Sequence, residues 1–320
     1  MLRSITDNIL NGINITKPQV METLLTADLN SLSACADEIR QKLCGNRVDL
    51  CSIINGKCGR CSEDCKFCVQ SLNCKSELDA HGFIDKNTYI SACKKAEESR
   101  IDCFSIVTSG RTLTPDDYET AKELYASANR ECNGIMQCAS HGLLTKEQLE
   151  GLKKAGIKRY HANLETSERY FPYICTTHTY ADKIRLIKDA QSVGLDVCSG
   201  GIIGIGETTE DRIDMAFQLK ELNIKSIPIN IYIPLEGTFF RDIPSPSYDE
   251  IIRIIAIFRF INPKADIRLA AGRVSMPDCG LRAFKSGANA TITGDMLTTT
   301  GSGTKEDIQM LTDNGFTIGE

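Results

Sequence analysis

The sequence predicts one α/β domain of the (β/α)8 TIM-barrel type, preceded by a short helical extension. Short apolar runs alternate with amphipathic segments eight times over about 270 residues, which matches the size of such a barrel. Several amphipathic segments end in Gly directly before the next apolar run, where a helix is expected to stop. No Pro/Ser-rich linker divides the chain, so we predict a helical extension over residues 1–46 and one barrel domain over residues 47–320. A doubly wound open sheet is the alternative.

Each element follows from a local pattern. Lys17-Pro18 fits the first turn of a helix, and residues 29–43 carry apolar side chains at helical spacing. Short runs rich in apolar residues predict eight strands, at Val48–Ile54, Asp102–Thr108, Gly134–Ser140, Arg159–Glu165, Asp196–Ile203, Ser226–Ile233, Asp266–Ala271 and Ala290–Thr293. Helical periodicity predicts helices at Lys86–Ser99, Asp116–Asn129, Lys146–Ala155, Tyr180–Val193, Thr209–Leu222, Tyr248–Phe260, Asp278–Lys285 and Thr304–Asn314.

Composition and charge exclude several classes of protein. A net charge of −5 and a pI near 5.6 give no basic surface for nucleic acid or an anionic membrane. No apolar run approaches the ~20 residues of a membrane-spanning helix, and the N-terminus has no secretory signal pattern. Fifteen cysteines without such a signal argue against a disulfide framework. We expect a cytoplasmic protein whose thiols are metal ligands or small core residues. The core role is expected for Cys35, Cys44, Cys93 and Cys175.

Three cysteines, Cys61, Cys65 and Cys68, stand close together with the spacing C-x3-C-x2-C. Thiolate is the preferred ligand of iron–sulfur clusters and of zinc. Three ligands leave one of four positions open, and an open position is where chemistry can occur. The alternative is a closed four-thiolate zinc site completed by one of the nearby thiols of Cys51, Cys58 and Cys74.

The alternation of side chains along the strands predicts a polar barrel interior. Successive side chains point to opposite faces, and the more apolar face should pack on the helices. Around Ile227–Ile233 four Ile share one face, so Asn230 and Tyr232 should point inward. The same reasoning points inward Cys103, Ser105, Cys138, His161, Asn163, Glu165, Cys198 and Arg268. Burying such groups costs several kcal/mol unless each has a partner, so we predict that the interior holds ligands.

Two further features have less definite interpretations. The run Gly200–Glu207 follows a strand with the spacing G-x-x-G-x-G, which differs from the dinucleotide fingerprint. It could expose its backbone to a bound nucleoside or amino-acid moiety, because Gly permits close approach. Of the four histidines, His161 is expected inside the barrel. We expect the other three, His81, His141 and His178, on the surface or in loops.

Seven segments give the chain a family resemblance. They are Cys61–Ser71, Ile106–Arg111, Asn163–Ser167, Val197–Thr208, Ile227–Asn230, Ile267–Arg273 and Leu297–Thr299. With these segments in family order, the chain resembles the radical S-adenosylmethionine superfamily and, within it, the biotin synthases. The three-cysteine loop points only to the superfamily. The Cys-Ser-Gly-Gly and Arg-Leu-x-Ala-Gly-Arg segments are far more specific.

The resemblance implies an activity and its cofactors. Cys61, Cys65 and Cys68 would hold a 4Fe–4S cluster with S-adenosylmethionine on its fourth iron, and reductive cleavage would give methionine and a 5′-deoxyadenosyl radical. The substrate would be dethiobiotin, which gains sulfur from a second iron–sulfur cluster, either 2Fe–2S or larger. No side chain would act as a catalytic acid or base. Flavodoxin or ferredoxin would supply electrons, and the protein would be a homodimer.

The resemblance also assigns the second-cluster ligands. The family uses three Cys and one Arg there, and Cys138, Cys198 and Arg268 match three of those positions. The remaining position is Ser105 in this chain, with Cys103 two residues earlier on the same strand face. The fourth ligand is therefore expected to be Cys103 or Ser105. Further candidates are Cys58 and Cys279.

Contacts to the two small molecules follow in the same way. The residues that match the S-adenosylmethionine site are Phe67, Asn163, Glu165, Lys183, Ile202 and Ile233. Those that match dethiobiotin contacts are His161, Asn163, Asn230, Thr298 and Thr299. Glu165 stands where the family has Asp, and His161 replaces an Asn, although a neutral imidazole can still donate one hydrogen bond.

Two other functions compete with this one. The departures at Ser105 and His161 favour another radical enzyme on the same barrel, such as a mutase or maturase, that acts on a different small molecule. A non-catalytic iron–sulfur or zinc protein would explain the three-cysteine loop. It would not explain Arg268 or the polar interior.

Overall fold

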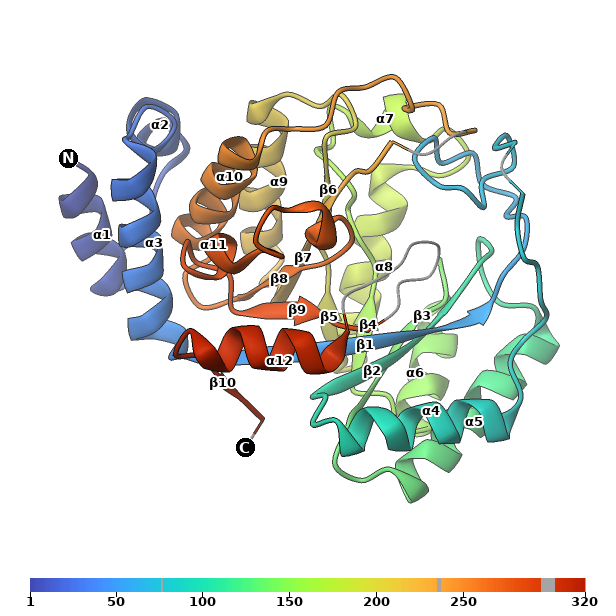
Figure 1. Cartoon of the computed structure of the whole chain (residues 1–320). Coiled ribbons are helices and arrows are strands. Elements are labelled where there is room, and N and C mark those ends of the chain that lie inside the picture. The colour runs from blue at the N-terminus through green and yellow to red at the C-terminus, as the bar shows by residue number, and fades with distance from the viewer. Residues whose placement is uncertain (76, 235–236, 295–302, 320) are drawn as a thin grey trace.

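The computed structural model describes residues 1–75, 77–234, 237–294 and 303–319. Its centre is a closed barrel of parallel strands with helices around it (Figure 1). Strand β1 (Arg47–Lys57) pairs with both β2 (Cys103–Thr108) and β9 (Ala290–Ile292), which closes the ring. Strands β5 (Asp196–Cys198) and β6 (Gly201–Ile203) both pair with β7 and occupy one strand position. The predicted TIM-type barrel is therefore confirmed.

The remaining strands complete the ring in chain order. They are β3 (Met136–Ser140), β4 (Arg159–His161), β7 (Ser226–Ile231) and β8 (Asp266–Leu269). A short strand, β10 (Thr317–Ile318), pairs with the start of β1 outside the ring. The outward faces of the strands carry buried apolar side chains such as Phe104, Ile106 and Ile227, which join the large hydrophobic core.

The helices that cover the barrel begin and end at the expected signals. They are α4 (Lys86–Glu98), α5 (Pro115–Glu131), α6 (Lys146–Lys154), α8 (Tyr180–Ser192), α9 (Thr209–Glu221), α10 (Tyr248–Ile261), α11 (Leu281–Phe284) and α12 (Thr304–Asp313), with the short α7 (Phe171–Ile174) and a 3-10 turn at Arg273–Ser275. Thr145, Thr179 and Thr208 each accept a hydrogen bond from the third residue of the helix that follows. Gly156 and Gly194, which follow helices, have φ of 117° and 78°, as expected for helix stops.

The N-terminal residues form helices α1 (Leu2–Leu10), α2 (Lys17–Gln19) and α3 (Leu29–Cys44), with a π-helical turn at Val20–Leu24. They lie on one side of the barrel, with α3 against α10 (Figure 1). Arg253 on α10 donates to the carbonyl oxygens of Leu24 and Ala27 at 3.0 and 2.8 Å. The predicted helical content of this region is confirmed, and a domain boundary near residue 46 stays a prediction.

Several element ends differ from the prediction. Strand β4 ends at His161 rather than Glu165, which has a φ of 71°. The predicted strand 196–203 is interrupted at Gly200, where a Cβ atom would lie 1.9 Å from the carbonyl oxygen of Pro228. Helix α11 begins at Leu281 because the Asp278 carboxylate accepts from the amides of Gly280 and Arg282. These ends depend on neighbouring strands and caps rather than on local periodicity.

Among the described residues, no helix has the length and apolar character needed to cross a membrane.

Candidate functional site

A cavity of about 350 Å³ lies inside the barrel, bounded by the inward faces of the strands and by the loop that follows β1. This volume is within the range of small-molecule sites. All side chains predicted to point inward line it: Cys103, Ser105, Cys138, His161, Asn163, Glu165, Cys198, Asn230, Tyr232 and Arg268. The strand alternation therefore predicted these polar lining residues correctly. It was wrong for Ile231 and Ile233, which were expected to point outward and also line the cavity.

The three-cysteine loop lies at one end of this cavity. Cys68 lines the cavity together with Phe67, whereas Cys61 and Cys65 do not, and all three thiols are half-buried. The backbone holds the loop in a tight fold, with the amide of Cys61 donating to Gln70 O at 2.8 Å and that of Cys68 to Cys65 O at 3.1 Å. Burial raises the pKa of the Cys68 thiol to about 11, so binding to a metal would require loss of its proton.

A polar network fixes this loop to the segment after α7. The buried carboxylate of Glu63 accepts from Arg111 Nη1 at 3.1 Å and from Thr177 Oγ1 at 2.8 Å, and it also contacts the ring of His178. Next to it, Asp64 accepts from the amide of Thr176 at 2.8 Å. Although burial opposes it, hydrogen bonds from Thr177, His178 and Arg111 hold the pKa of Glu63 below its usual value. The network keeps both carboxylates ionised and the loop in one position.

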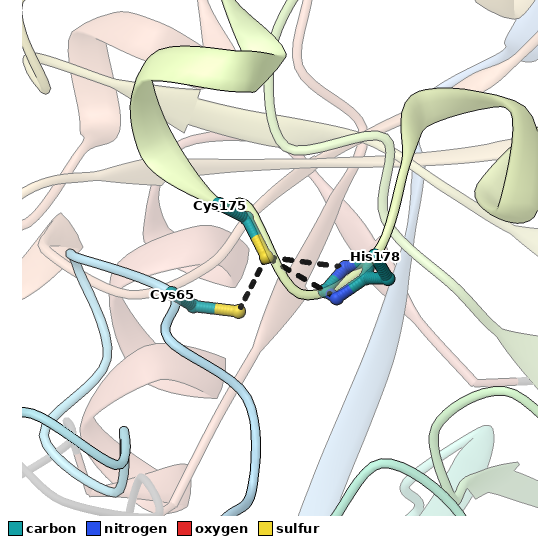
Figure 2. Close-up of side chains that lie close together, drawn as sticks. All are labelled: Cys65, Cys175 and His178. Carbon is teal, nitrogen blue, oxygen red and sulfur yellow. Dashed lines mark hydrogen bonds between the residues drawn. The ribbon is translucent and has the colours of Figure 1, made fainter.

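Cys175 and His178 lie beside Cys65 within this network (Figure 2). Cys175 Sγ is 3.8 Å from Cys65 Sγ and 3.2 Å from His178 Nδ1. A hydrogen bond from Cys65 lowers the pKa of the Cys175 thiol to about 4, despite burial. Burial opposes the charge on His178, but Cys175 and Glu63 raise its pKa. His178 lies in the loop between α7 and α8, in line with the expectation of a surface or loop residue, but its ring is buried against Glu63 and Phe171. Cys175 is buried as expected but contacts a cluster-loop thiol.

Three thiols from adjacent strands meet at the other end of the cavity, which we call the floor. Cys51, Cys103 and Cys138 pack together there with Met136 and Ile292. Cys51 and Cys103 are register partners on β1 and β2, and the Cys103 thiol packs against both Cys51 and Cys138. The neighbouring Cys103 thiol and burial raise the pKa values of Cys51 and Cys138, whereas these two neighbouring thiols lower the pKa of Cys103 although burial opposes it.

Sequence reasoning missed Cys51 as a cavity residue. Applied to Val48–Ile54, the alternation places Leu50 outward and Cys51 and Ile53 inward, so the signal was present. The zinc alternative grouped Cys51 with Cys58 and Cys74. The structure separates them, because neither Cys58 nor Cys74 lines the cavity among its described residues.

The floor also carries Cys198 and two arginines. Cys198 Sγ lies 3.4 Å from Ser226 Oγ, which also accepts from Arg268 Nε at 3.3 Å. Arg268 donates further to the carbonyl oxygen of Thr291 at 3.0 Å and to both the carbonyl and the carboxylate of Asp49. Arg159, which sequence reasoning missed, lines the cavity with its Nη1 3.9 Å from Cys103 Sγ.

The floor has two unsatisfied groups. Ser105 Oγ and Arg159 Nε are buried without a hydrogen-bond partner among the described residues. Four thiols and two orphaned polar groups in one enclosed space are the donor set expected for a thiolate-bound, anionic inorganic group. The residues present therefore fit a second iron–sulfur cluster. The exposed Cys279 and the buried Cys58, the further candidates, do not line the cavity.

The middle of the cavity carries the residues predicted to bind S-adenosylmethionine. Asn163 donates to Glu165 at 3.2 Å and accepts from the amide of Gly200 at 3.0 Å. Phe67, Ile202 and Ile233 supply apolar surface to the same space. The sixth predicted residue, Lys183 on α8, is absent from the described lining. Its charge acts on His161 and on Cys65.

Of the predicted substrate contacts, His161, Asn163 and Asn230 line the cavity. His161 lines the cavity, its ring has no hydrogen-bond partner among the described residues, and burial lowers its pKa to about 4. Asn230 bridges strands, donating to Gly201 O and accepting from the amide of Ala271, each at 3.2 Å. Thr298 and Thr299 lie outside the described residues.

The glycine-rich segment packs closely against neighbouring backbone, and its predicted exposure to a nucleoside or amino-acid moiety stays a prediction. A Cβ at Gly201 would lie 2.5 Å from Glu165 O, so this glycine permits close approach of neighbouring backbone. Further along, the amides of Gly204 and Ile205 both donate to the Glu207 carboxylate at 2.8 Å. These two amides therefore form hydrogen bonds within the protein. Only the intervening Ile202 faces the cavity from this segment.

His141 lies in the loop directly after β3, in line with the expectation of a surface or loop residue, and its ring is fully buried. Its two ring nitrogens lie 3.0 Å from Thr108 Oγ1 and 2.8 Å from Tyr125 OH. Burial lowers its pKa to about 3. His141 is therefore a neutral packing residue behind the cavity wall.

Comparisons with known proteins agree with this arrangement. Residues 57–219 match the family described as Radical SAM superfamily, and residues 228–317 match the Biotin and Thiamin Synthesis associated domain. The chain is 51% identical over 317 residues to the biotin synthase of Clostridium beijerinckii, covering 99% of this chain and 100% of that protein. It is also 51% identical over 315 residues to the biotin synthase of Alkaliphilus metalliredigens, covering 98% and 99%.

Solved structures agree in fold. Methylornithine synthase superposes with a TM-score of 0.85 at 19% identity, covering 99% of this chain and 97% of that one. The FeFe-hydrogenase maturase HydG from Carboxydothermus hydrogenoformans gives 0.82 at 15% identity, covering 98% and 78%. At these identities the likeness concerns the fold alone.

Proposed function

The chain belongs to the biotin synthases of the radical S-adenosylmethionine superfamily, and from this premise we propose how its own residues divide the work. Biotin synthases convert dethiobiotin to biotin by radical-mediated sulfur insertion. When bound, a 4Fe–4S cluster with S-adenosylmethionine supplies the 5′-deoxyadenosyl radical, and a second iron–sulfur cluster supplies the sulfur. The protein binds, orients and encloses these groups.

Cys61, Cys65 and Cys68 are the proposed ligands of the first cluster. The support is the position of their loop, which brings Cys68 to the cavity while the Glu63 and Asp64 network fixes the loop from behind. Three thiolates leave one iron free for S-adenosylmethionine. Cys175 and His178 close the outer side of Cys65 and limit solvent access to it.

Phe67, Asn163, Glu165, Ile202 and Ile233 are the proposed contacts of S-adenosylmethionine. The apolar members offer surface to the adenine ring, and Asn163 with Glu165 offers hydrogen-bonding groups to its polar atoms. Lys183 acts through its charge from outside the lining. For dethiobiotin we propose His161, Asn163 and Asn230, together with Thr298 and Thr299. The neutral ring of His161 has one donor and one acceptor available for a ureido group.

The proposed ligands of the second cluster are the four floor thiols of Cys51, Cys103, Cys138 and Cys198. Four thiolates are the usual ligand set of both 2Fe–2S and 4Fe–4S clusters. We propose Cys103 rather than Ser105 as the ligand at this position, because the Cys103 thiol packs against Cys51 and Cys138. Arg268 is the second candidate ligand. As a ligand it would have to exchange some of its bonds to Asp49, Ser226 and Thr291.

Two further proposals concern the electron donor and the oligomeric state. We propose flavodoxin or ferredoxin as the donor, because Cys61 and Cys65 are only half-buried and so lie near the surface. A homodimer in the cytoplasm is the proposed state of the protein.

The observation that carries the proposal is that two separate clusters of cysteines lie at opposite ends of one cavity. Anaerobic reconstitution tests it, with iron and sulfide counted per chain and biotin formation measured with dethiobiotin and S-adenosylmethionine. We expect clearly more than the ~4 irons of one cubane cluster, and biotin as product. Iron that stops at about four would contradict the second cluster. Cleavage of S-adenosylmethionine without biotin would contradict the substrate.

A further inference from the structure

The guanidinium of Arg159 is charged, enclosed and nearly without partners. The residue is 8% exposed and lines the cavity floor. Its Nε has no hydrogen-bond partner among the described residues, and its Nη1 has only a long contact of 3.9 Å to Cys103 Sγ. Asp196, the acidic register neighbour of Arg159, is engaged by Lys225 at 2.6 Å.

Two other buried arginines in this barrel, Arg259 and Arg268, are satisfied by protein groups. Arg259 donates to the carbonyl oxygens of Gly287 and Ala265 at 2.7 and 2.8 Å and to Asn289 Oδ1 at 2.6 Å. Arg268 donates to Ser226, Thr291 and Asp49, as described above. An enclosed charge without such partners is strongly unfavourable. Arg159 therefore lacks something that the protein alone does not provide.

The surroundings of Arg159 indicate what it lacks. The titratable groups near it are the thiols of Cys138, Cys103 and Cys198 and the guanidinium of Arg268. Thiols that bind iron lose their protons, so this space becomes negatively charged when metal enters. The planar guanidinium of Arg159 can donate several N–H hydrogen bonds to sulfur atoms around it. Hydrogen bonds to the sulfurs of a cluster help to set its reduction potential.

We propose that Arg159 is a cluster-contacting residue, whose guanidinium donates to the sulfurs of the second cluster and offsets its negative charge, whereas Arg268, the second candidate ligand, already has partners on neighbouring strands. This inference rests on the proposed function, because it requires a cluster at the floor. Nothing in the sequence resemblance points to Arg159. In this arrangement the unpaired charge destabilises the empty protein, and cluster binding removes that cost.

The test compares Arg159→Met with Arg268→Met in two states of the full chain. In the apo-protein, thermal unfolding should show an unchanged or higher Tm for Arg159→Met, because an unpaired charge is removed. Arg268→Met should lower the Tm, because it leaves Asp49 without its partner. After anaerobic reconstitution, cluster binding should raise the Tm of Arg159→Met by less than it raises the Tm of the wild-type protein. Loss of Tm in apo Arg159→Met equal to that of Arg268→Met would overturn the proposal.

A second readout is the reduction potential of the second cluster, followed by EPR during redox titration. Removal of the positive charge in Arg159→Met should shift that potential to more negative values and leave the first cluster unchanged. Arg159→Lys keeps the charge and should restore part of the shift. A wild-type potential in Arg159→Met would overturn the inference, and so would a raised KM for dethiobiotin with no other change, because the guanidinium would then pair with substrate.

The two levels of the proposal fail in different ways. Wild-type protein that takes up only the first cluster overturns both the proposed function and this inference. Wild-type protein that takes up both clusters, with Arg159→Met indistinguishable from it in apo and loaded states, overturns the inference alone.

Discussion

The two ends of the cavity hold thiols by opposite means. At the loop end, Cys61, Cys65 and Cys68 lie within one short segment, and buried carboxylates with their polar partners fix that segment in place. At the floor, Cys51, Cys103, Cys138 and Cys198 come from four strand positions, and the barrel backbone itself sets their spacing. A loop site can therefore loosen by local rearrangement, whereas the floor changes only if strands move. This difference predicts different responses to mutation.

The largest expected effect is loss of the first cluster. Cys68→Ala should abolish cleavage of S-adenosylmethionine and hence biotin formation, because no other thiol of the loop lines the cavity among the described residues. Iron should remain at the floor. Cys58→Ala is the control, since Cys58 is a nearby buried thiol outside the cavity lining. Substantial cleavage by Cys68→Ala would show that another thiol replaces it.

Substitution of a floor cysteine should affect the second cluster and not the first. Cys103→Ala should lose the absorbance and iron of the second cluster and lower biotin formation by more than about 100-fold, since the loss of an outer-shell partner alone costs 10–100-fold. The first cluster should remain. Ser105→Ala and Cys93→Ala, a buried thiol away from the cavity, are matched controls that should behave like wild type. If Ser105→Ala loses the cluster and Cys103→Ala does not, the ligand assignment reverses.

The polar support of the loop should matter less than its thiols. Glu63→Gln removes the charge that Arg111 and His178 contact, at a cost of about 2–3 kcal/mol. We expect faster iron loss from the first cluster to a chelator and unchanged loss from the second. The exposed Glu77→Gln is the control. Equal loss from both clusters would mean that the network supports the whole barrel.

The smallest effect concerns pH and the barrel wall. His141 has a pKa near 3 when folded, through burial, and about 6.5 when unfolded. Its contribution to stability is complete above pH 6.5 and is lost as pH falls toward 3. Between pH 7 and 5 this loss amounts to about 2 kcal/mol. Urea unfolding of apo-protein should show a smaller loss over that range in His141→Gln. An identical pH dependence would mean that the ring is already charged at pH 5.

The comparison also explains what could be predicted from sequence. The three-cysteine loop is contiguous, so its spacing alone revealed it. The cavity lining followed from period-two alternation, because a closed barrel turns one strand face inward along its whole circumference. The contact of Cys175 and His178 with Cys65 could not be predicted, because these residues lie about 110 positions apart in the chain. Their burial depends on how α7 meets the loop.

The sequence by itself determined the barrel, the family and the position of the three-cysteine loop, because each rests on local periodicity or on contiguous motifs. Only the tertiary structure decided which scattered side chains share the floor. Cys51 joins Cys103 through the register of β1 and β2, and Arg159 differs from Arg268 only in what surrounds it. Hydrogen-bond partners between distant strands are a property of three-dimensional packing. No single segment encodes them.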